Sequence, residues 1–494
     1  MSCPDQSLQH LPAPDAAACE SLPSAQAPPV PKRTYQAGTL LYTKMGLVAV
    51  FFWLLWGGFC LRLMELVMPA LLPLKLKSAH ASNFTIGLIV VSIPAALNMI
   101  LCPIISTWSD RHRGPRGRRI PFLFWPTPFI ALFLVLTAYS TDLGTWLHHV
   151  ATLRPGLTLS RAWAILIVLG ICMVGFQVFN MFVGSVYYYL WADVVPQAFL
   201  GRFISLFQFA ATGGGWIWNY YIFGLASTHM KAIFIGIGVF YFTAFMLMCL
   251  RVKEGRYPPP PLMPRGPGGG AVGMVRTYFR ECFRHPYYVW FFLSTSLFNM
   301  ASSTSVFLIF FYRDTLKLSL EQIGQVLSWT IVLTFLLLIP AGWICDKLHP
   351  LRVSLAVYAA TSVTAFLCFF GIHNERTMLI FLLVAQVPAA FFLAANLPMY
   401  ASLLPADRYG QFCSAQAAFQ SVVMILVPPL AGVFLDWMGN YRYAFFWQAV
   451  MTIPALLVLL LVYRGWRRYG GAKNYVAPPV DASAAKPHQP RPEL

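Results

Sequence analysis

Two ionisable side chains stand inside the apolar stretch "GGFCLRLMELVMPALLP" (57–73). Arg62 and Glu65 are three residues apart, so on a helix they share one face and can pair. A charge inside a membrane costs about 3 kcal/mol or more, and such residues usually face a bundle interior or a wet cavity. A buried carboxyl group can carry a proton, and a nearby guanidinium can orient a polar ligand. The spacing therefore favours a proton- or cation-coupling Glu65 beside a ligand-orienting Arg62. A structural ion pair, or an Arg62 that reaches outward, is the alternative.

Neutral polar side chains recur at helical spacing in several other apolar stretches. Amides and hydroxyls can match the hydroxyl groups of a sugar, although they also commonly join helices inside membrane bundles. Because several stretches carry such stripes, we expect one polar cavity. Its predicted lining residues are Gln177, Asn180, Tyr187, Gln208, Thr212, Asn219, Asn299, Gln386, Asn396, Gln416 and Gln420. We assign the neighbouring Tyr188–Tyr189 pair to packing or to the membrane interface.

The elements that position these residues are membrane helices. The 494 residues are 58% hydrophobic and only 11% charged, and runs of about 20 apolar residues, enough to cross a bilayer, recur along the chain. We predict an all-α polytopic membrane protein whose twelve transmembrane helices form two six-helix bundles. The predicted spans are about 45–72, 84–108, 120–140, 162–191, 201–226, 232–250, 287–312, 321–345, 352–371, 377–403, 410–435 and 443–463.

The placement of Lys and Arg predicts the orientation. They are concentrated in the segments that lie on the same side as the N-terminus, and such segments are cytoplasmic under the positive-inside rule. Both termini should therefore be cytoplasmic. The predicted parts are a disordered cytoplasmic N-terminal tail (1–44), an N-terminal bundle (45–250), a basic Pro/Gly-rich cytoplasmic linker (251–286), a C-terminal bundle (287–463) and a cytoplasmic C-terminal tail (464–494).

The two halves also echo each other. "SNFTIGLIV" and "SLEQIGQVL" lead into corresponding spans, and they share a Ser, an Ile and a Gly, the last being Gly87 and Gly324. Both of these spans end in an acid followed by a base, and "ADVVPQAFLGRF" matches "ASLLPADRYGQF". Parallel repeats of six spans, with one half rocking against the other, are typical of major facilitator transporters.

Two loops carry a resemblance to that superfamily. "GWICDK" (342–347) looks like its inter-helix loop signature, whereas the first copy has Ser106 in place of the glycine. The run "DRHRGPRGRRIPF" (110–122) resembles the glycoside–pentoside–hexuronide:cation symporters and the sucrose–proton symporters. This resemblance implies sugar or glycoside symport with a cation, over about residues 40–465.

Alternating access needs contacts that break and reform, and acids and bases at helix ends can supply them, each worth about 1 kcal/mol when partly exposed. We expect such residues to pair across the two bundles as a cytoplasmic gate. The predicted gate residues are Asp110, Arg111, Arg118, Arg119, Asp193, Arg202, Asp346 and Lys347. Alternatively, these charges only set the orientation of the protein in the membrane.

The leading hypothesis is a secondary active transporter that imports a sugar with a proton, or with sodium, across a bacterial inner membrane. Export of an amphipathic compound by proton exchange, and a non-transporting sensor or scaffold, are the alternatives. The net charge of +18 sits in loops between spans, which favours membrane anchoring over nucleic-acid binding. No catalytic or phosphate-loop motif appears, so we expect no enzyme activity, no cofactor and no obligatory protein partner.

Overall fold

The computed structural model describes residues 35–153, 159–255, 257, 282–405 and 408–478. Within these residues, eleven segments are long and apolar enough to cross a membrane. They are Lys44–Ser78 (α1), Asn83–Arg111 (α2, Asn83–Gly87; η1, Leu88–Ser92; α3, Ile93–Arg111), Ile120–Ala138 (α4, Ile120–Phe124; α5, Pro126–Ala138), Arg161–Val194 (α7), Gln197–Arg251, Pro286–Thr315 (α11, Pro286–Ala301; η4, Ser302–Phe307; α12, Leu308–Phe310; η5, Phe311–Thr315), Leu320–Leu348 (α13), Pro350–Gly371 (α14), Glu375–Leu403 (α15), Tyr409–Met438 (α16) and Tyr443–Arg468 (α17).

The segment Gln197–Arg251 contains two spans. As one straight helix its 55 residues would extend about 80 Å, far beyond a hydrocarbon core of about 30 Å. Instead α8 (Gln197–Ile217) and α9 (Ala226–Arg251) both pack on α1, so the chain reverses between them. The described chain therefore has the predicted twelve spans.

Several helices begin at side chains that cap them. Thr43 accepts from the backbone N–H of Gly46 at the start of α1, and Ser82 does the same for Thr85 in α2. Ser319 and Gln322 form a reciprocal capping box at α13, which satisfies two otherwise unpaired N–H groups. The serine of the internal repeat is therefore a helix cap in both halves.

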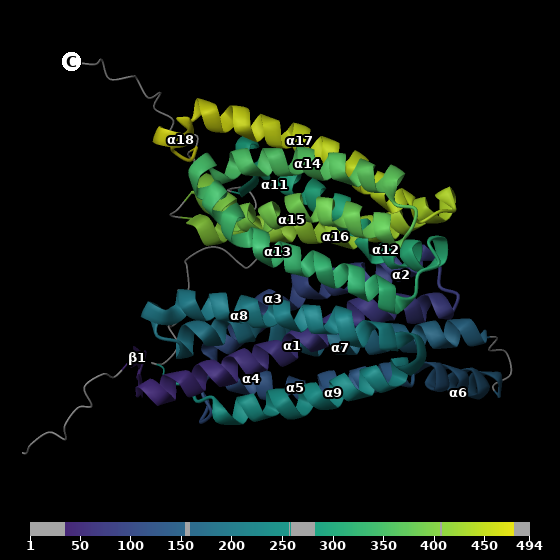
Figure 1. The fold of residues 1–494 in the computed structure, drawn as a ribbon. Helices are drawn as coiled ribbons and strands as arrows, with labels where there is room; N and C mark the ends of the chain where they lie inside the picture. The colour runs from purple at the N-terminus through teal and green to yellow at the C-terminus, as the bar shows by residue number, and fades with distance from the viewer. Residues whose placement is uncertain (1–34, 154–158, 256, 258–281, 406–407, 479–494) are drawn as a thin grey trace, which may run out of the picture.

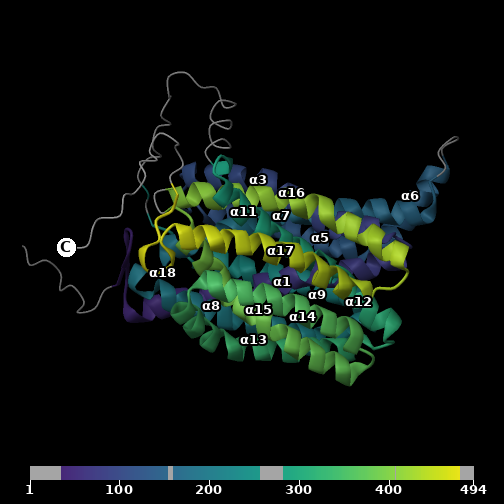
Figure 2. The same cartoon turned by 90° about the horizontal axis from the view of Figure 1, so that it is seen from above.

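The helices form two bundles that lie one above the other in Figure 1. In the N-terminal bundle α5 packs on α7 and α9, and α1 packs on α8 and α9. In the C-terminal bundle α13 and α14 pack on α15, while α11 and α14 pack on α17. The bundles meet where α2 and α3 contact α16 and where α8 and the short turns η2 (Trp218–Ile222) and η3 (Phe223–Leu225) contact α13. Figure 2 gives the view from above.

The two ends of the molecule differ. We call the end where α1 begins and α17 finishes the tail end, on the left of Figure 1, and the opposite end the far end. An additional helix, α6 (Ser140–Thr152), extends from the far end of the N-terminal bundle.

Parts of the predicted tails are ordered. Tyr35–Ala37 (β1) and Leu40–Tyr42 (β2) form an antiparallel hairpin whose turn uses Gly38 at φ 57°. Its Tyr35 ring packs edge-on against Phe199 at 5.2 Å, so the prediction of a disordered tail is wrong for these residues. After α17, a short helix α18 (Gly471–Asn474) follows, and the hydroxyl of Tyr475 donates to the Leu403 carbonyl at 2.7 Å. Residues 1–34, most of the linker and 479–494 lie outside the described residues.

Candidate functional site

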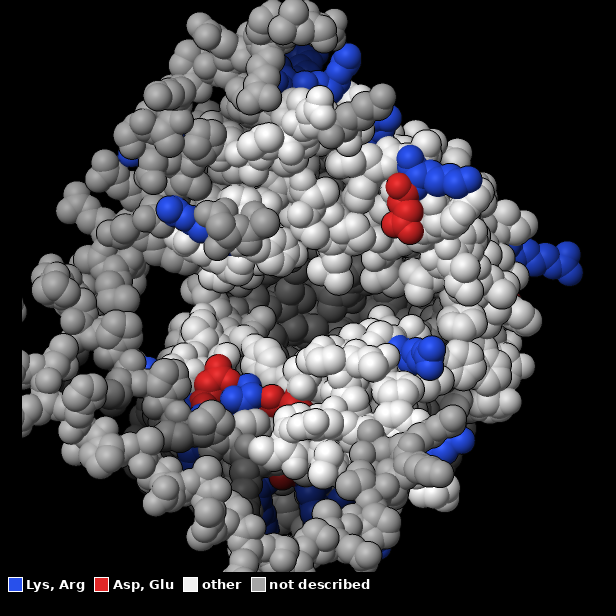
Figure 3. Space-filling view, turned by 90° about the vertical axis from the view of Figure 1, so that its left-hand side faces the viewer, with Lys and Arg blue, Asp and Glu red and all other residues white. Residues whose placement is uncertain are grey.

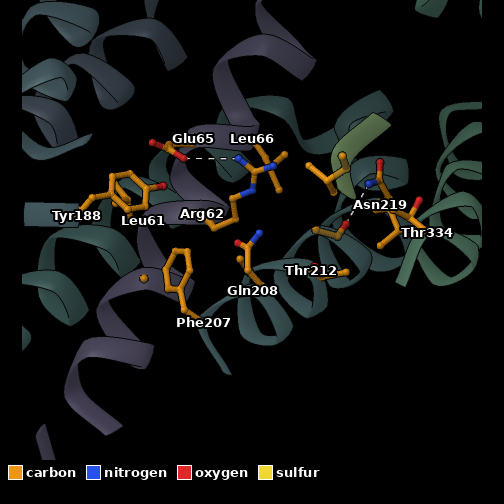
Figure 4. Close-up of a pocket in the computed structure, with 15 residues that line it drawn as sticks. Leu61, Arg62, Glu65, Leu66, Tyr188, Phe207, Gln208, Thr212, Asn219 and Thr334 are labelled. Atoms are coloured by element: carbon orange, nitrogen blue, oxygen red, sulfur yellow. Dashed lines mark hydrogen bonds and ion pairs between the residues drawn. The ribbon is translucent and has the colours of Figure 1, made fainter. Parts of the chain in front are cut away.

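A cavity of about 370 Å³ lies between the two bundles and contains the charged pair (Figure 4). Its lining residues are Gly58, Leu61, Arg62, Glu65, Leu66, Tyr188, Phe207, Gln208, Ala211, Thr212, Gly215, Asn219, Ile331, Thr334 and Leu393. Most come from α1 and from the span that begins with α8, while α13 and α15 supply the last three. The cavity is therefore shared by both halves of the chain.

Helical spacing explains the lining from α1. Leu61, Arg62 and Glu65 follow Gly58 by three, four and seven residues, so the four share one face of the helix. A Cβ atom at Gly58 would collide with the Phe207 ring, so glycine lets α8 approach at this level. The lining from Gln208, Thr212 and Asn219 follows the same helical rule along the neighbouring span.

The charged pair is loosely held. Arg62 Nη1 lies 3.6 Å from Glu65 Oε2, and the arginine side chain is 49% exposed against 24% for the glutamate. A guanidinium carries five N–H donors, and among the described residues this long contact to Glu65 is its one ion pair, so most donors of this cavity-lining side chain have no carboxylate partner there. The structure thus brings Arg62 and Glu65 together at the cavity wall, beside the amide of Gln208.

Three residues predicted for the cavity from α7 lie elsewhere. Tyr187 is fully buried and its hydroxyl donates to the Leu54 carbonyl of α1. Gln177 and Asn180 are also buried, and Gln177 contacts the sulfur of Met181 at 3.9 Å. This stripe points into the N-terminal bundle, and Tyr188, assigned to packing from the sequence, turns into the cavity instead.

The polar residues of the C-terminal bundle mostly bond to one another. Gln416 donates to Thr295 Oγ1 at 3.3 Å and to Gln420 Oε1 at 2.9 Å, and Asn299 donates to the Thr295 carbonyl at 2.8 Å. This network joins α11 to α16, which is the interhelical role left open from the sequence. Gln386 stands one step behind the cavity, because its amide donates to the lining Thr334 at 2.6 Å. Asn396 is half-buried on α15 and is not among the lining residues.

Hydrogen bonds join the bundles at the far end. Asn83 Nδ2 donates to Asp436 Oδ1 at 2.7 Å, and its backbone N–H donates to Oδ2 at 3.2 Å. The hydroxyl of Tyr441 donates to Asn83 Oδ1 at 3.0 Å and accepts from Lys77 Nζ at 2.5 Å. No local sequence pattern indicates these contacts, because the two partners of each bond lie in opposite halves of the chain.

Close backbone contacts reinforce this closure. A Cβ atom built on Gly87 would lie 2.6 Å from the Pro428 carbonyl oxygen of α16. A Cβ on Gly324 would overlap the carbonyl oxygen of Asn219, and one on Gly432 would overlap that of Asn83. The repeated glycines Gly87 and Gly324 therefore each lie where the backbone of one bundle closely approaches the other. At the tail end, by contrast, Figure 3 shows a hollow between the bundles.

An ion-pair cluster lies at the tail end of the N-terminal bundle. Arg118 binds Asp193 through both Nε, at 3.0 Å, and Nη2, at 2.5 Å. Arg119, which is buried, contacts the same carboxylate at 3.3 Å and also binds Asp110 and the hydroxyl of Ser109. These pairs join segments of one bundle, so the prediction that they bridge the two bundles is wrong for this conformation.

The remaining predicted gate residues are exposed. Arg111 and Asp346 form no ion pair with any described residue. Lys347 Nζ lies 3.5 Å from the Trp343 ring centroid, and the Arg202 guanidinium lies 5.7 Å from that of Phe199. A role for these residues in gating stays a prediction.

Glu254 attaches the start of the linker to this cluster. Its carboxylate accepts the backbone N–H groups of Arg118, Arg119 and Ile120 at 2.9, 2.8 and 2.5 Å, and so caps α4 (Ile120–Phe124). The Tyr257 hydroxyl adds a contact of 3.1 Å. Burial raises the pKa of Glu254, although these hydrogen bonds oppose the shift.

The comparisons with known proteins concern the fold. The sequence model described as "Major Facilitator Superfamily" matches residues 291–486, and no curated protein sequence matches the chain. A bacterial homologue of the human lysosomal transporter Spinster, in an inward-facing and unoccupied conformation, is 13% identical with a TM-score of 0.64, covering 89% of this chain and 100% of its own. The peptide transporter POT in complex with sulfate is 15% identical with a TM-score of 0.62, covering 85% and 95%. The nucleoside transporter NupG is 11% identical with a TM-score of 0.59, covering 84% and 100%. The chain thus has the major facilitator fold, and its residues 291–486 match the sequence model of that superfamily.

Proposed function

We propose that the protein is a secondary active transporter of the major facilitator superfamily that moves a sugar together with a proton by alternating access. One observation carries the proposal: an arginine–glutamate pair stands in a cavity shared by two bundles, which hydrogen bonds and close backbone contacts hold together at the far end. Such an arrangement exposes an internal binding site to one side of a membrane at a time.

The lining suggests how a sugar is bound. Gln208 and Thr212 offer amide and hydroxyl groups to sugar hydroxyls, and the rings of Tyr188 and Phe207 offer apolar faces to its C–H surface. The neutral, mixed character of these groups favours a sugar over a strongly apolar compound. The resemblance to glycoside and sucrose symporters supports the same substrate class.

The charged pair suggests how the proton is coupled. With Glu65 ionised, Arg62 is partly neutralised by it; when Glu65 takes up a proton, Arg62 is released to donate to the substrate. Proton and sugar therefore favour each other's binding, and this mutual dependence is what couples two fluxes. If the tails are cytoplasmic, as the basic loops predict, the cavity opens towards the cytoplasm of a bacterial cell.

The test compares sugar counterflow and proton uptake in proteoliposomes, using a panel of mono- and disaccharides. Glu65→Gln should keep sugar exchange but lose sugar-driven proton movement. Asp142→Asn is the matched control, because Asp142 is an exposed carboxylate that binds Lys231 at 2.7 Å outside the cavity. This control should transport like the native protein.

Three other results would replace the proposal. Sugar uptake driven by sodium alone would change the coupling ion. Transport of lipophilic cations without any sugar would favour the exporter. Absence of transport of every compound, with the charged pair replaceable at no cost to folding or binding, would favour a sensor or scaffold.

A further inference from the structure

A second hollow lies on the outside of the C-terminal bundle, away from the central cavity. It is a groove of about 300 Å³ between α13 and α14, with α15 as its floor. Its lining residues are Ile344, Leu348, Arg352, Val353, Ala356, Val357, Ala360, Val387, Pro388 and Phe391. Nine of these ten side chains are apolar, and the exception is Arg352.

Side-chain size explains why the groove exists. α13 and α14 both pack closely on α15 but touch each other much less. Along α14 the residues facing the gap follow helical spacing, and two of them, Ala356 and Ala360, are too small to fill it. The space between the two helices is therefore left for something that is not part of this bundle.

The groove faces the bilayer. α14 packs on α15 and α17 within its own bundle and contributes nothing to the central cavity. Figure 2 shows α13 and α14 along the outer edge of the molecule. From Arg352 to Ala360 the helix rises about 12 Å, close to the depth of one leaflet in a hydrocarbon core of about 30 Å. The groove thus runs from the tail-end surface to about the middle of the membrane.

Its mouth carries positive charge. The Arg352 side chain is exposed, lies 5.6 Å from the Trp466 ring centroid and forms no ion pair with a described residue. Exposed Lys347 lies in the last turn of α13, five residues before Arg352, and its neighbour Asp346 is the one acid in that turn. Arg467 and Arg468 follow Trp466 at the end of α17 and are exposed as well. Basic residues at this depth attract anionic lipid headgroups.

We propose that the groove is a binding site for one anionic phospholipid of the tail-side leaflet. An acyl chain lies between α13 and α14 against Ala356 and Ala360, and the phosphate is held by Arg352. The groove is about as deep as one leaflet and combines a cationic mouth with apolar walls, which fits a phospholipid. A soluble anion would bind at the mouth alone and leave the apolar part of the groove empty.

The full-length protein is placed in vesicles of phosphatidylcholine, with or without phosphatidylglycerol, and then extracted. Native mass spectrometry measures how much phosphatidylglycerol stays bound. Arg352→Gln should reduce retention about fivefold, the effect of one basic residue near a membrane surface. Arg251→Gln is the matched control, because Arg251 is also exposed at the tail end and stacks on a tryptophan, Trp53, at 5.7 Å. Ala356→Phe should fill the groove and displace the lipid, whereas Val239→Phe, on the exposed face of α9, should not.

Each contrary outcome overturns the proposal. Equal losses in Arg352→Gln and Arg251→Gln would mean that surface charge alone attracts the lipid. Retention unchanged in Ala356→Phe would mean that the acyl chain lies elsewhere. If phosphatidylcholine is retained as well as phosphatidylglycerol, the groove does not select an anionic headgroup. If inorganic phosphate displaces the bound molecule, the site binds a soluble anion and not a lipid.

Discussion

Replacing Gly87 by alanine should open the far end of the protein. The added Cβ would lie 2.6 Å from the carbonyl oxygen and 2.8 Å from the carbonyl carbon of Pro428, and 3.0 Å from the backbone nitrogen of Pro429. These are backbone atoms of α16, so no side-chain rotation relieves the contact, and the two helices must separate.

The size of the effect follows from the cost of overpacking. Forcing a methyl group into a tight contact costs about 1–3 kcal/mol, and only the conformation closed at the far end bears this cost. The ratio of far-end-open to far-end-closed molecules should therefore rise about 5- to 150-fold. Gly324→Ala should act in the same direction, because its Cβ would overlap the Asn219 carbonyl oxygen where η2 contacts α13.

Amide hydrogen exchange measures this shift without labels. In Gly87→Ala, exchange should become faster at the far-end turns of α2 and α16, and slower at the tail end of α3. The control is Gly236→Ala in α9, whose Cβ would meet no atom within 4 Å. If Gly87→Ala exchanges like Gly236→Ala, the close approach of α2 to α16 does not hold the far end closed, and the reasoning is refuted.

Three further results should follow from the described contacts. Asp193→Asn leaves Arg118 and buried Arg119 without their shared carboxylate, so the free energy of unfolding should fall by about 3 kcal/mol in thermal unfolding. The exposed control Asp142→Asn should lose less than about 1 kcal/mol, and equal losses would contradict this prediction. Burial raises the pKa of Glu254 above its ordinary 4.5, so the folded protein holds this proton more tightly than the unfolded chain. The contribution of Glu254 to stability therefore falls as the pH rises from 4.5 towards the raised pKa of the folded state. Glu254→Gln should therefore flatten the dependence of the unfolding temperature on pH. An unchanged slope would mean that Glu254 does not cause this pH dependence. Arg62→Lys keeps the charge but loses the planar fork, so sugar affinity should fall about tenfold in counterflow while proton coupling persists.

Much of the architecture was predictable because it depends on local properties of the chain. Runs of apolar residues placed the twelve spans, and the serines of the repeat cap helices in both halves. The free-energy cost of a charge inside the membrane also predicted that Arg62 and Glu65 face a cavity, and in the structure both line one. Their roles in coupling remain a prediction.

The facing of individual helices was harder to predict. The polar stripe of α7 has helical spacing, but spacing alone does not say which neighbour the stripe faces. In the structure it turns inward, Tyr187 bonds to α1, and the adjacent Tyr188 reaches the cavity. A rotation of about 100° per residue separates these two outcomes.

The sequence by itself determined that this is a membrane protein of two repeated six-helix halves with a charged pair inside the first span, since hydropathy and the cost of burying a charge act residue by residue. The tertiary structure decided which contacts close the protein. Asn83 meets Asp436 across 353 residues, and the tail-end arginines pair within one bundle rather than across two. Such partners are selected by how whole helices pack, and no local pattern contains that information.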